Sequence, residues 1–235
     1  MLGIYGVVQI PGGGFSPMVI GEEFGAIALF AAFIVRQRTA ANPLVPLRLF
    51  KTRNIALSNA CNALVAAALF TFFFLDTLTL RREGYDAVAT GLAFLPFTIS
   101  IAIFSLGWAE RLTTRFGERP AFLAGIALAT IGMLWLTIAS PSHDYLIAVF
   151  PPMLITGVGL GIAFPALMIF AMWGTDADDA GIASGIVNTT SEGGGAFGLA
   201  ALATVGTLWG FTAAFAAATV LLACACAIAF RLDEA

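Results

Sequence analysis

Long apolar stretches with almost no charged residues constrain this sequence more than any other feature. Seven are long enough to cross a lipid bilayer, near residues 18–35, 54–76, 87–108, 119–139, 145–171, 180–205 and 209–230. A helix rises 1.5 Å per residue, so about twenty residues span the roughly 30 Å of hydrocarbon. Only 11% of the residues are charged, against about a quarter in soluble proteins. The sequence therefore predicts an all-α polytopic membrane protein.

Basic residues are distributed unevenly between the two sides of the predicted spans. With alternating crossings, nine of them share one side: Arg36, Arg38, Arg48, Lys51, Arg53, Arg111, Arg115, Arg119 and Arg231. Only Arg81 and Arg82 fall on the other side. Because short cytoplasmic loops are enriched in Lys and Arg, the side with nine is predicted to be cytoplasmic. The C-terminus and loops 36–53, 109–118 and 172–179 would then be cytoplasmic.

The order of the spans predicts an internal repeat. Residues 54–139 and residues 140–235 each hold three spans, and the two sets cross the membrane in opposite directions. Inverted sets of three helices are a common plan of secondary transporters. We predict these ranges as two three-helix repeats, although any six consecutive spans divide in this way.

Five motifs, in order along the chain, carry a resemblance to a known family. They are NPLVPLRLFKTRN (42–54), GYDAVATGLAFLP (84–96), GWAERLTTRFGERPAFLAG (107–125), ITGVGLGIAFP (155–165) and DAGIASGIVNTTSEGGGAFGLA (179–200). Together they resemble the fourteen-span drug:proton antiporters of the major facilitator superfamily. The third looks like the superfamily's cytoplasmic loop motif, which would use Gly107, Arg115, Gly117 and Arg119. Two departures stand out: Thr114 replaces that motif's aspartate, and Ser191-Glu192 replaces the family's usual Arg-Gln pair.

The resemblance implies the C-terminal six-helix half of such a transporter, preceded by a linker helix. Residues 1–53 would be the end of one linker helix, a second linker helix and a basic cytoplasmic loop. The implied partners are the lipid bilayer, protons, a small organic substrate and the N-terminal half of the transporter, which this chain lacks. The implied location is the plasma (inner) membrane of a bacterium.

A polar stripe interrupts the apolar span 180–205. On a helix, Ser184, Asn188, Ser191 and Glu192 share one face, whereas Ile182, Ile186 and Phe197 point away from it. A helix that begins near residue 180 places Glu192 about 18 Å along its axis, near the bilayer centre. A charged carboxylate facing lipid there is costly, so Glu192 is expected to face the bundle or a wet cavity. It is either the proton-coupling residue or a carboxylic acid hydrogen-bonded within the bundle.

Other polar residues of the spans are weaker candidates for the same site. Asp76 is a second candidate for proton coupling, but its place near the end of span 54–76 also allows anchoring at the interface. Asn59 and Asn62 either line the substrate cavity with Ser184, Asn188 and Ser191 or bond between helices.

Glycines recur in two of the spans. Gly157 and Gly161, and the group Gly194, Gly195 and Gly198, have the spacing of small residues that let helix backbones approach closely. We predict helix packing as their role rather than contact with a ligand.

Several classes of function have no support in the sequence. No zincin, serine-hydrolase or Walker A motif occurs, so no enzyme activity and no cofactor is predicted. Cys224 and Cys226 lie on nearly opposite faces of a helix and cannot share a metal, and no basic cluster suggests nucleic acid.

The favoured interpretation is the C-terminal part of a secondary transporter that exports amphipathic organic compounds in exchange for protons. A carrier of another substrate class on the same fold, and a non-transporting gene fragment, are the alternatives.

Overall fold

The computed structural model describes residues 52–139, 144–173 and 179–232. Its elements are α3 (Arg53–Arg82), α4 (Ala87–Ala93), α5 (Leu95–Ile103), the π-helix η2 (Phe104–Trp108), α6 (Ala109–Phe116), α7 (Glu118–Ala139), α8 (Tyr145–Ala148), α9 (Phe150–Ala171), α10 (Ala180–Trp209) and α11 (Phe211–Ala229). The expected span near 18–35, and nearly all of the range 1–53, lie outside the described residues.

The predicted all-α membrane fold is confirmed. Among the described residues, five helical segments are long and apolar enough to span a membrane: Arg53–Arg82, Ala87–Phe116, Glu118–Ala139, Tyr145–Ala171 and Phe211–Ala229. Helix α10 is not among these segments, because its polar stripe interrupts every sufficiently apolar stretch of it, but at 30 residues it equals α3 in length and packs along it. Two predicted spans were too short, since span 54–76 continues to Arg82 and span 87–108 continues to Phe116.

Two glycines make the tightest connections in the bundle. Gly117 separates α6 from α7, and Gly210 separates α10 from α11, each as a single residue with φ near +90° (89° and 88°). Residues with a side chain rarely adopt this backbone conformation, which glycine adopts freely. Consecutive spans therefore reverse direction without a loop between them.

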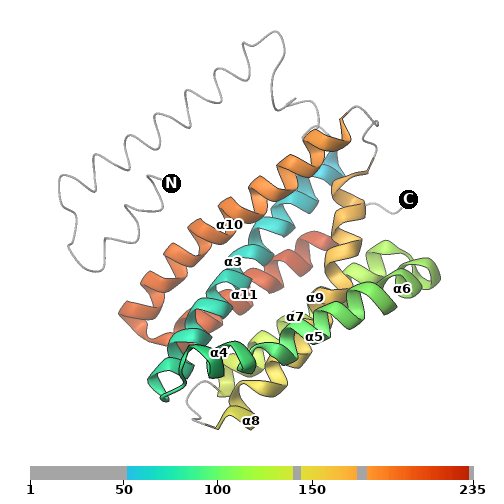
Figure 1. The fold of residues 1–235 in the computed structure, drawn as a ribbon. Coiled ribbons are helices and arrows are strands. Elements are labelled where there is room, and N and C mark those ends of the chain that lie inside the picture. The colour runs from blue at the N-terminus through green and yellow to red at the C-terminus, as the bar shows by residue number, and fades with distance from the viewer. Residues whose placement is uncertain (1–51, 140–143, 174–178, 233–235) are drawn as a thin grey trace, which may run out of the picture.

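Helices α3 and α10 lie side by side and run in the same direction (Figure 1). Ile55 packs with Ile186 near one end of the pair, and Leu75 is close to Gly206 near the other end. Between them, Gly194 and Gly198 lie directly against Ala63 and Ala67 of α3, so the backbones nearly touch. The first and fifth spans of this bundle thus cross in parallel.

Helix α9 makes the corresponding contacts in the other half of the bundle. Gly157 and Gly161 lie against Phe97 and Ile101 of α5, so α9 and α5 are also parallel. Helix α7 packs on α9 in the opposite direction, with Gly125 close to Ala163 and Gly132 close to Thr156. Helix α11 likewise runs antiparallel to α3, where the Cys61 Sγ donates to Ala225 O at 3.4 Å. The first helix of each set of three thus packs in parallel on the second helix of the other set.

The core between the helices is apolar and rich in aromatic rings. Phe72, Phe122, Phe170 and Phe215 are among its largest fully buried side chains. Phe72 and its neighbour Phe73 also pack against Phe94 and Phe97 in edge-to-face and tilted pairs, with ring centroids 5.1–6.2 Å apart. This ring cluster holds the helical segment Ala87–Phe116 against α3.

Candidate functional site

A small polar network joins α3 to α10 inside the bundle. Thr190 Oγ1 donates to Asn59 Oδ1 at 2.8 Å, and Asn62 Nδ2 donates to Val187 O at 2.8 Å and to Thr190 Oγ1 at 3.2 Å. Asn59 Nδ2 also donates to Ile55 O, four residues earlier on its own helix. Both asparagines are buried, so they bond between and within the helices rather than line an open cavity in this bundle.

The opposite face of α10 carries polar side chains that none of the residues described by the structure covers. Asn188, Thr189 and Glu192 are exposed, and Ser184 and Ser191 are half-buried beside them. A Cβ added at Gly181, Gly185 or Gly193 would also meet no atom within 4 Å. This open polar face contains the Glu192 carboxylate at about the middle of a helix 30 residues long.

The inner face of α10 differs from the one that the sequence predicted. Ile186 is buried against Ile55 of α3, and Ile182 packs against the same pair, so neither points away from the bundle. The polar stripe faces outward because the small residues of α10, not its polar ones, make the close approach to α3. Thr190, which no sequence argument singled out, lies on the inner side and completes the network with Asn59 and Asn62.

Asp76 lies inside the bundle and does not reach its surface. It is 1% exposed, and its Oδ2 atom has no hydrogen-bond partner. One turn earlier on α3 come Phe72 and Phe73 of the ring cluster. This enclosed position does not fit the alternative in which the Asp76 side chain reaches the membrane interface, and α3 continues for six more residues to Arg82.

The five glycines predicted to pack helices, Gly157, Gly161, Gly194, Gly195 and Gly198, all lie at helix contacts. A Cβ added at Gly194 would lie 2.5 Å from Ala63 Cα, and one at Gly195 would lie 2.7 Å from the Phe70 ring. A Cβ at Gly157 would lie 2.7 Å from Phe97 O, and one at Gly161 3.0 Å from Ile101 O. Contacts below about 3 Å are not tolerated by real side chains, so Gly157 and Gly194, which face backbone atoms, need glycine for packing. At Gly161 and Gly195 a side chain would require the neighbouring residue to shift.

The residues of the loop motif connect three elements at the Arg53 end of the bundle. Gly107 lies in the π-helix, Arg115 stacks on the Phe116 ring at 5.3 Å, and Gly117 makes the turn into α7. Arg119 then donates to the Phe230 carbonyl at the end of α11. The motif therefore ties the start of α7 to the end of α11.

Two acids lie well inside the long helices of the described residues, and no metal cluster accompanies them. Within residues 52–139, 144–173 and 179–232, no three His, Cys, Asp or Glu side chains gather closely enough to hold a metal ion. What the bundle contains instead is one exposed acid on a polar helix face, Glu192, and one enclosed acid, Asp76. Both are side chains able to take up and release a proton.

Comparison with known proteins gives a consistent family assignment. The family model described as Major Facilitator Superfamily matches residues 24–199. The cephamycin export protein of Amycolatopsis lactamdurans is 33% identical over 195 residues, which cover 83% of this chain and 40% of that protein. The lincomycin resistance protein of Streptomyces lincolnensis is 32% identical over 191 residues, covering 81% of this chain and 39% of that protein.

A third relative aligns over more of the chain. The puromycin resistance protein of Streptomyces alboniger is 31% identical over 217 residues, covering 91% of this chain and 43% of that protein. The chain thus spans about two fifths of the length of the curated relatives that it matches.

Proposed function

This chain belongs to the major facilitator superfamily, and we propose that it forms part of a secondary transporter that exports amphipathic organic compounds in exchange for protons. The names of its relatives support export, because they describe cephamycin export and resistance to lincomycin and puromycin. The open polar face of α10 is the observation that carries the proposal.

That face is poorly suited to contact with lipid. A charged side chain at the bilayer centre costs about 3 kcal/mol on insertion scales, and hydrogen-bonding side chains there need polar partners. Asn188, Thr189 and Glu192 are exposed on the bundle. We therefore propose that this face of α10 borders a water-filled path and meets the remaining part of the transporter across it. In such a path Glu192 exchanges a proton and Asn188, Ser184 and Ser191 contact the substrate.

Asp76 is a second candidate for the coupling acid, on a separate observation. It is enclosed in the bundle with one carboxyl oxygen unpartnered, and ionisable groups within membrane spans are functional sites by default. The two acids make different demands on the protein. Glu192 needs only a wet path, whereas Asp76 needs a movement of the helices that opens the core to water.

The arginines support one orientation of the bundle. Five arginines of the described residues lie at one end of the bundle: Arg53, Arg111, Arg115, Arg119 and Arg231. The other two described arginines, Arg81 and Arg82, lie at the opposite end. We propose that the arginine-rich end faces the cytoplasm of a bacterial cell, in the plasma membrane.

Transport by the full-length protein in proteoliposomes tests this function. Lincomycin and puromycin are suitable probes because two relatives are named for resistance to them. An imposed pH gradient is expected to drive their accumulation, and Glu192→Gln to reduce it at least tenfold. Glu110→Gln, at an exposed acid of α6, is the matched control. Uptake that does not respond to the gradient would favour a carrier of another class, and no transport of any solute would favour a non-transporting role.

A further inference from the structure

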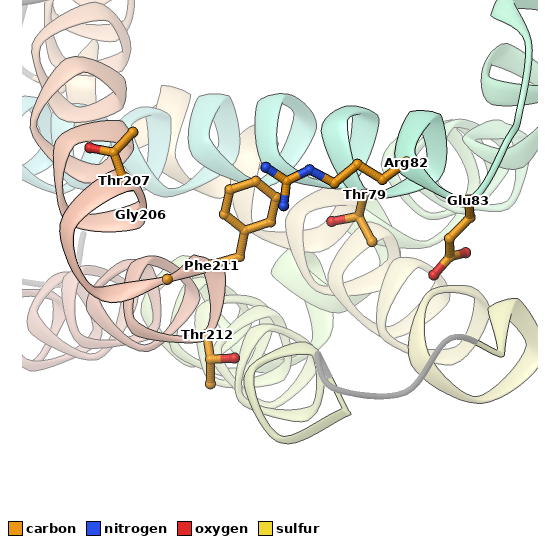
Figure 2. A pocket seen from close by; sticks show the side chains of 8 residues that line it. Thr79, Arg82, Glu83, Gly206, Thr207, Phe211 and Thr212 are labelled. Atoms are coloured by element: carbon orange, nitrogen blue, oxygen red, sulfur yellow. The ribbon is translucent and has the colours of Figure 1, made fainter. Parts of the chain in front are cut away.

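A cavity lies at the end of the bundle opposite to the arginine-rich end. Its volume is about 590 Å³, and it is lined by Thr79, Arg82, Glu83, Gly206, Thr207, Gly210, Phe211 and Thr212 (Figure 2). Gly206 lies roughly 20 Å along α10 from Glu192, so the cavity is separate from the polar face to which we assign proton exchange. Its volume falls within the range of about 300–1,000 Å³ of small-molecule sites. The cavity is therefore a second place where a ligand can bind.

Two arginines end α3 at this cavity, and only one of them lines it. Arg81 and Arg82 both lie in the last turn of the helix, where a positive charge is favourable because the last carbonyl groups carry partial negative charge. Arg82 has a further contact, since its guanidinium carbon lies 4.4 Å from the centroid of the Phe211 ring of α11. The end of the helix explains both charges, but it does not explain why one of them is held over a ring inside a cavity.

The ring holds the Arg82 guanidinium and leaves its hydrogen-bond donors available. The N–H groups of a guanidinium lie in its own plane, so a guanidinium that lies over a ring directs them past the ring (Figure 2). Among the described residues, no hydrogen bond or ion pair joins these N–H groups to another side chain or carbonyl. Thr79 and Thr207, in contrast, already donate their hydroxyl hydrogens to Leu75 O and Thr204 O of their own helices. Arg82 therefore supplies donors for an anion, in the geometry that binds a phosphate through two parallel hydrogen bonds.

The surroundings of the guanidinium favour an anion over a zwitterion. Glu83, the acid among the lining residues, lies on the other side of Arg82 from Thr207, and its carboxylate points away from the guanidinium in Figure 2. The face of the Phe211 ring that could attract a trimethylammonium group is covered by Arg82 itself. An ammonium group attached to the bound phosphate would thus gain little from the lining.

The level of the cavity in the bundle indicates where the anion comes from. Leu208 and Trp209, next to the lining residues, are 67% and 72% exposed, and tryptophan is enriched where membrane meets water. A Cβ added at Gly210 would meet no atom within 4 Å, so the space beside the ring is open. Phospholipid phosphates lie at that level of a membrane. We propose that this cavity binds an anionic phospholipid without an ammonium group, with its phosphate on Arg82 and its acyl chains along Leu208 and Trp209.

Native mass spectrometry of the full-length protein, released from nanodiscs, tests the proposal. The nanodiscs contain equal amounts of phosphatidylglycerol, phosphatidylethanolamine and phosphatidylcholine with identical acyl chains. One phosphatidylglycerol is expected to stay bound with a preference of about fivefold over the other two lipids, the size of the attraction between one arginine and an anionic lipid. Equal retention of the three lipids, or a preference for a zwitterionic one, would overturn the proposal.

The two neighbouring arginines supply a matched control. Arg82→Gln is expected to remove the preference for phosphatidylglycerol, whereas Arg81→Gln, at an exposed arginine outside the lining, makes the same change of charge and leaves the preference in place. Circular dichroism is expected to show the same helix content in both variants. Equal losses of preference would show general charge attraction and contradict a specific site.

A conservative variant tests the role of the planar guanidinium. Arg82→Lys keeps the positive charge, but an ammonium cannot form two parallel hydrogen bonds to a phosphate while it lies over a ring. The preference for phosphatidylglycerol is therefore expected to weaken in this variant. Full retention of the preference would contradict the binding geometry.

A soluble headgroup distinguishes a lipid from a free anion. Excess glycerophosphoglycerol is expected to displace little of the retained lipid, because it lacks the acyl chains that lie beside Leu208 and Trp209. Complete displacement at millimolar concentration would identify a soluble organic phosphate as the ligand instead and overturn the assignment to lipid.

Discussion

Thr190 donates its hydroxyl hydrogen to Asn59 at 2.8 Å across a separation of 131 residues in the sequence. The same separation relates Ala63 to Gly194 and Ala67 to Gly198, which are in direct contact. When the contacting residues of two helices keep a constant difference in residue number, the helices are parallel and in fixed register. The α3–α10 pair is thus held by one polar network and by a run of small residues, and the open polar face of α10 follows from it.

Two adjacent threonines distinguish the stability that comes from the α3–α10 polar network from the stability that comes from a hydrogen bond within α10. Thr190 bonds to α3, whereas the Thr189 hydroxyl donates to Gly185 O of its own helix and bonds to no other described residue. Thr190→Val is expected to lower the free energy of unfolding by about 0.6–1.7 kcal/mol, the range for hydrogen bonds between membrane helices. Thr189→Val is expected to change it by less than about 0.5 kcal/mol. Thermal unfolding in detergent measures both, and equal effects would exclude the network as a stabilising contact.

Adjacent glycines test the close approach of α3 and α10. A Cβ at Gly194 would lie 2.6 Å from Ala63 O, whereas one at Gly193 would meet nothing within 4 Å. Gly194→Ala is expected to destabilise the bundle by about 1–3 kcal/mol through overpacking. Gly193→Ala is expected to be neutral or to stabilise by up to about 1 kcal/mol, because alanine is the better helix former. Unfolding midpoints in the same detergent compare them, and a tolerated Gly194→Ala would contradict this register.

The existence of the spans was predictable, because it depends on local composition. The residues at which the spans end were not predictable. Hydropathy falls at the polar residues near 76, yet α3 continues to Arg82 and encloses Asp76. An isolated acid lowers the apolar average of a segment without ending its helix. Only the packing of neighbouring helices around Asp76 decides that it lies inside the bundle.

The candidate site was predictable in its residues and not in the direction that they face. The helical repeat groups Ser184, Asn188, Ser191 and Glu192 correctly relative to one another, but it gives no information about which face meets a neighbour. In the structure the small residues face α3, and Ile186 with them. Thr190 was missed because it lies among apolar positions on the helical wheel, and its partners are more than a hundred residues away in the sequence.

Labelling of single cysteines tests the proposed orientation. Asp86 and Glu110 are exposed near opposite ends of the helical segment Ala87–Phe116. In a background with Cys61, Cys224 and Cys226 replaced by serine, Asp86→Cys is expected to react with a membrane-impermeant maleimide in intact cells. Glu110→Cys is expected to react only after the cells are opened. Labelling of both from outside would exclude the alternating crossing, and the reverse pattern would invert the orientation.

Proton release on substrate binding tests most directly the claim that Glu192 couples transport to protons. Lincomycin is added to the full-length transporter in weakly buffered detergent, and a pH indicator records the protons released. The wild type is expected to release about one proton for each molecule bound when the acid is protonated beforehand. Glu192→Gln is expected to bind lincomycin and release none, while Asp76→Asn behaves as the wild type. Unchanged release by Glu192→Gln together with loss in Asp76→Asn would contradict the claim and assign the coupling to the enclosed acid.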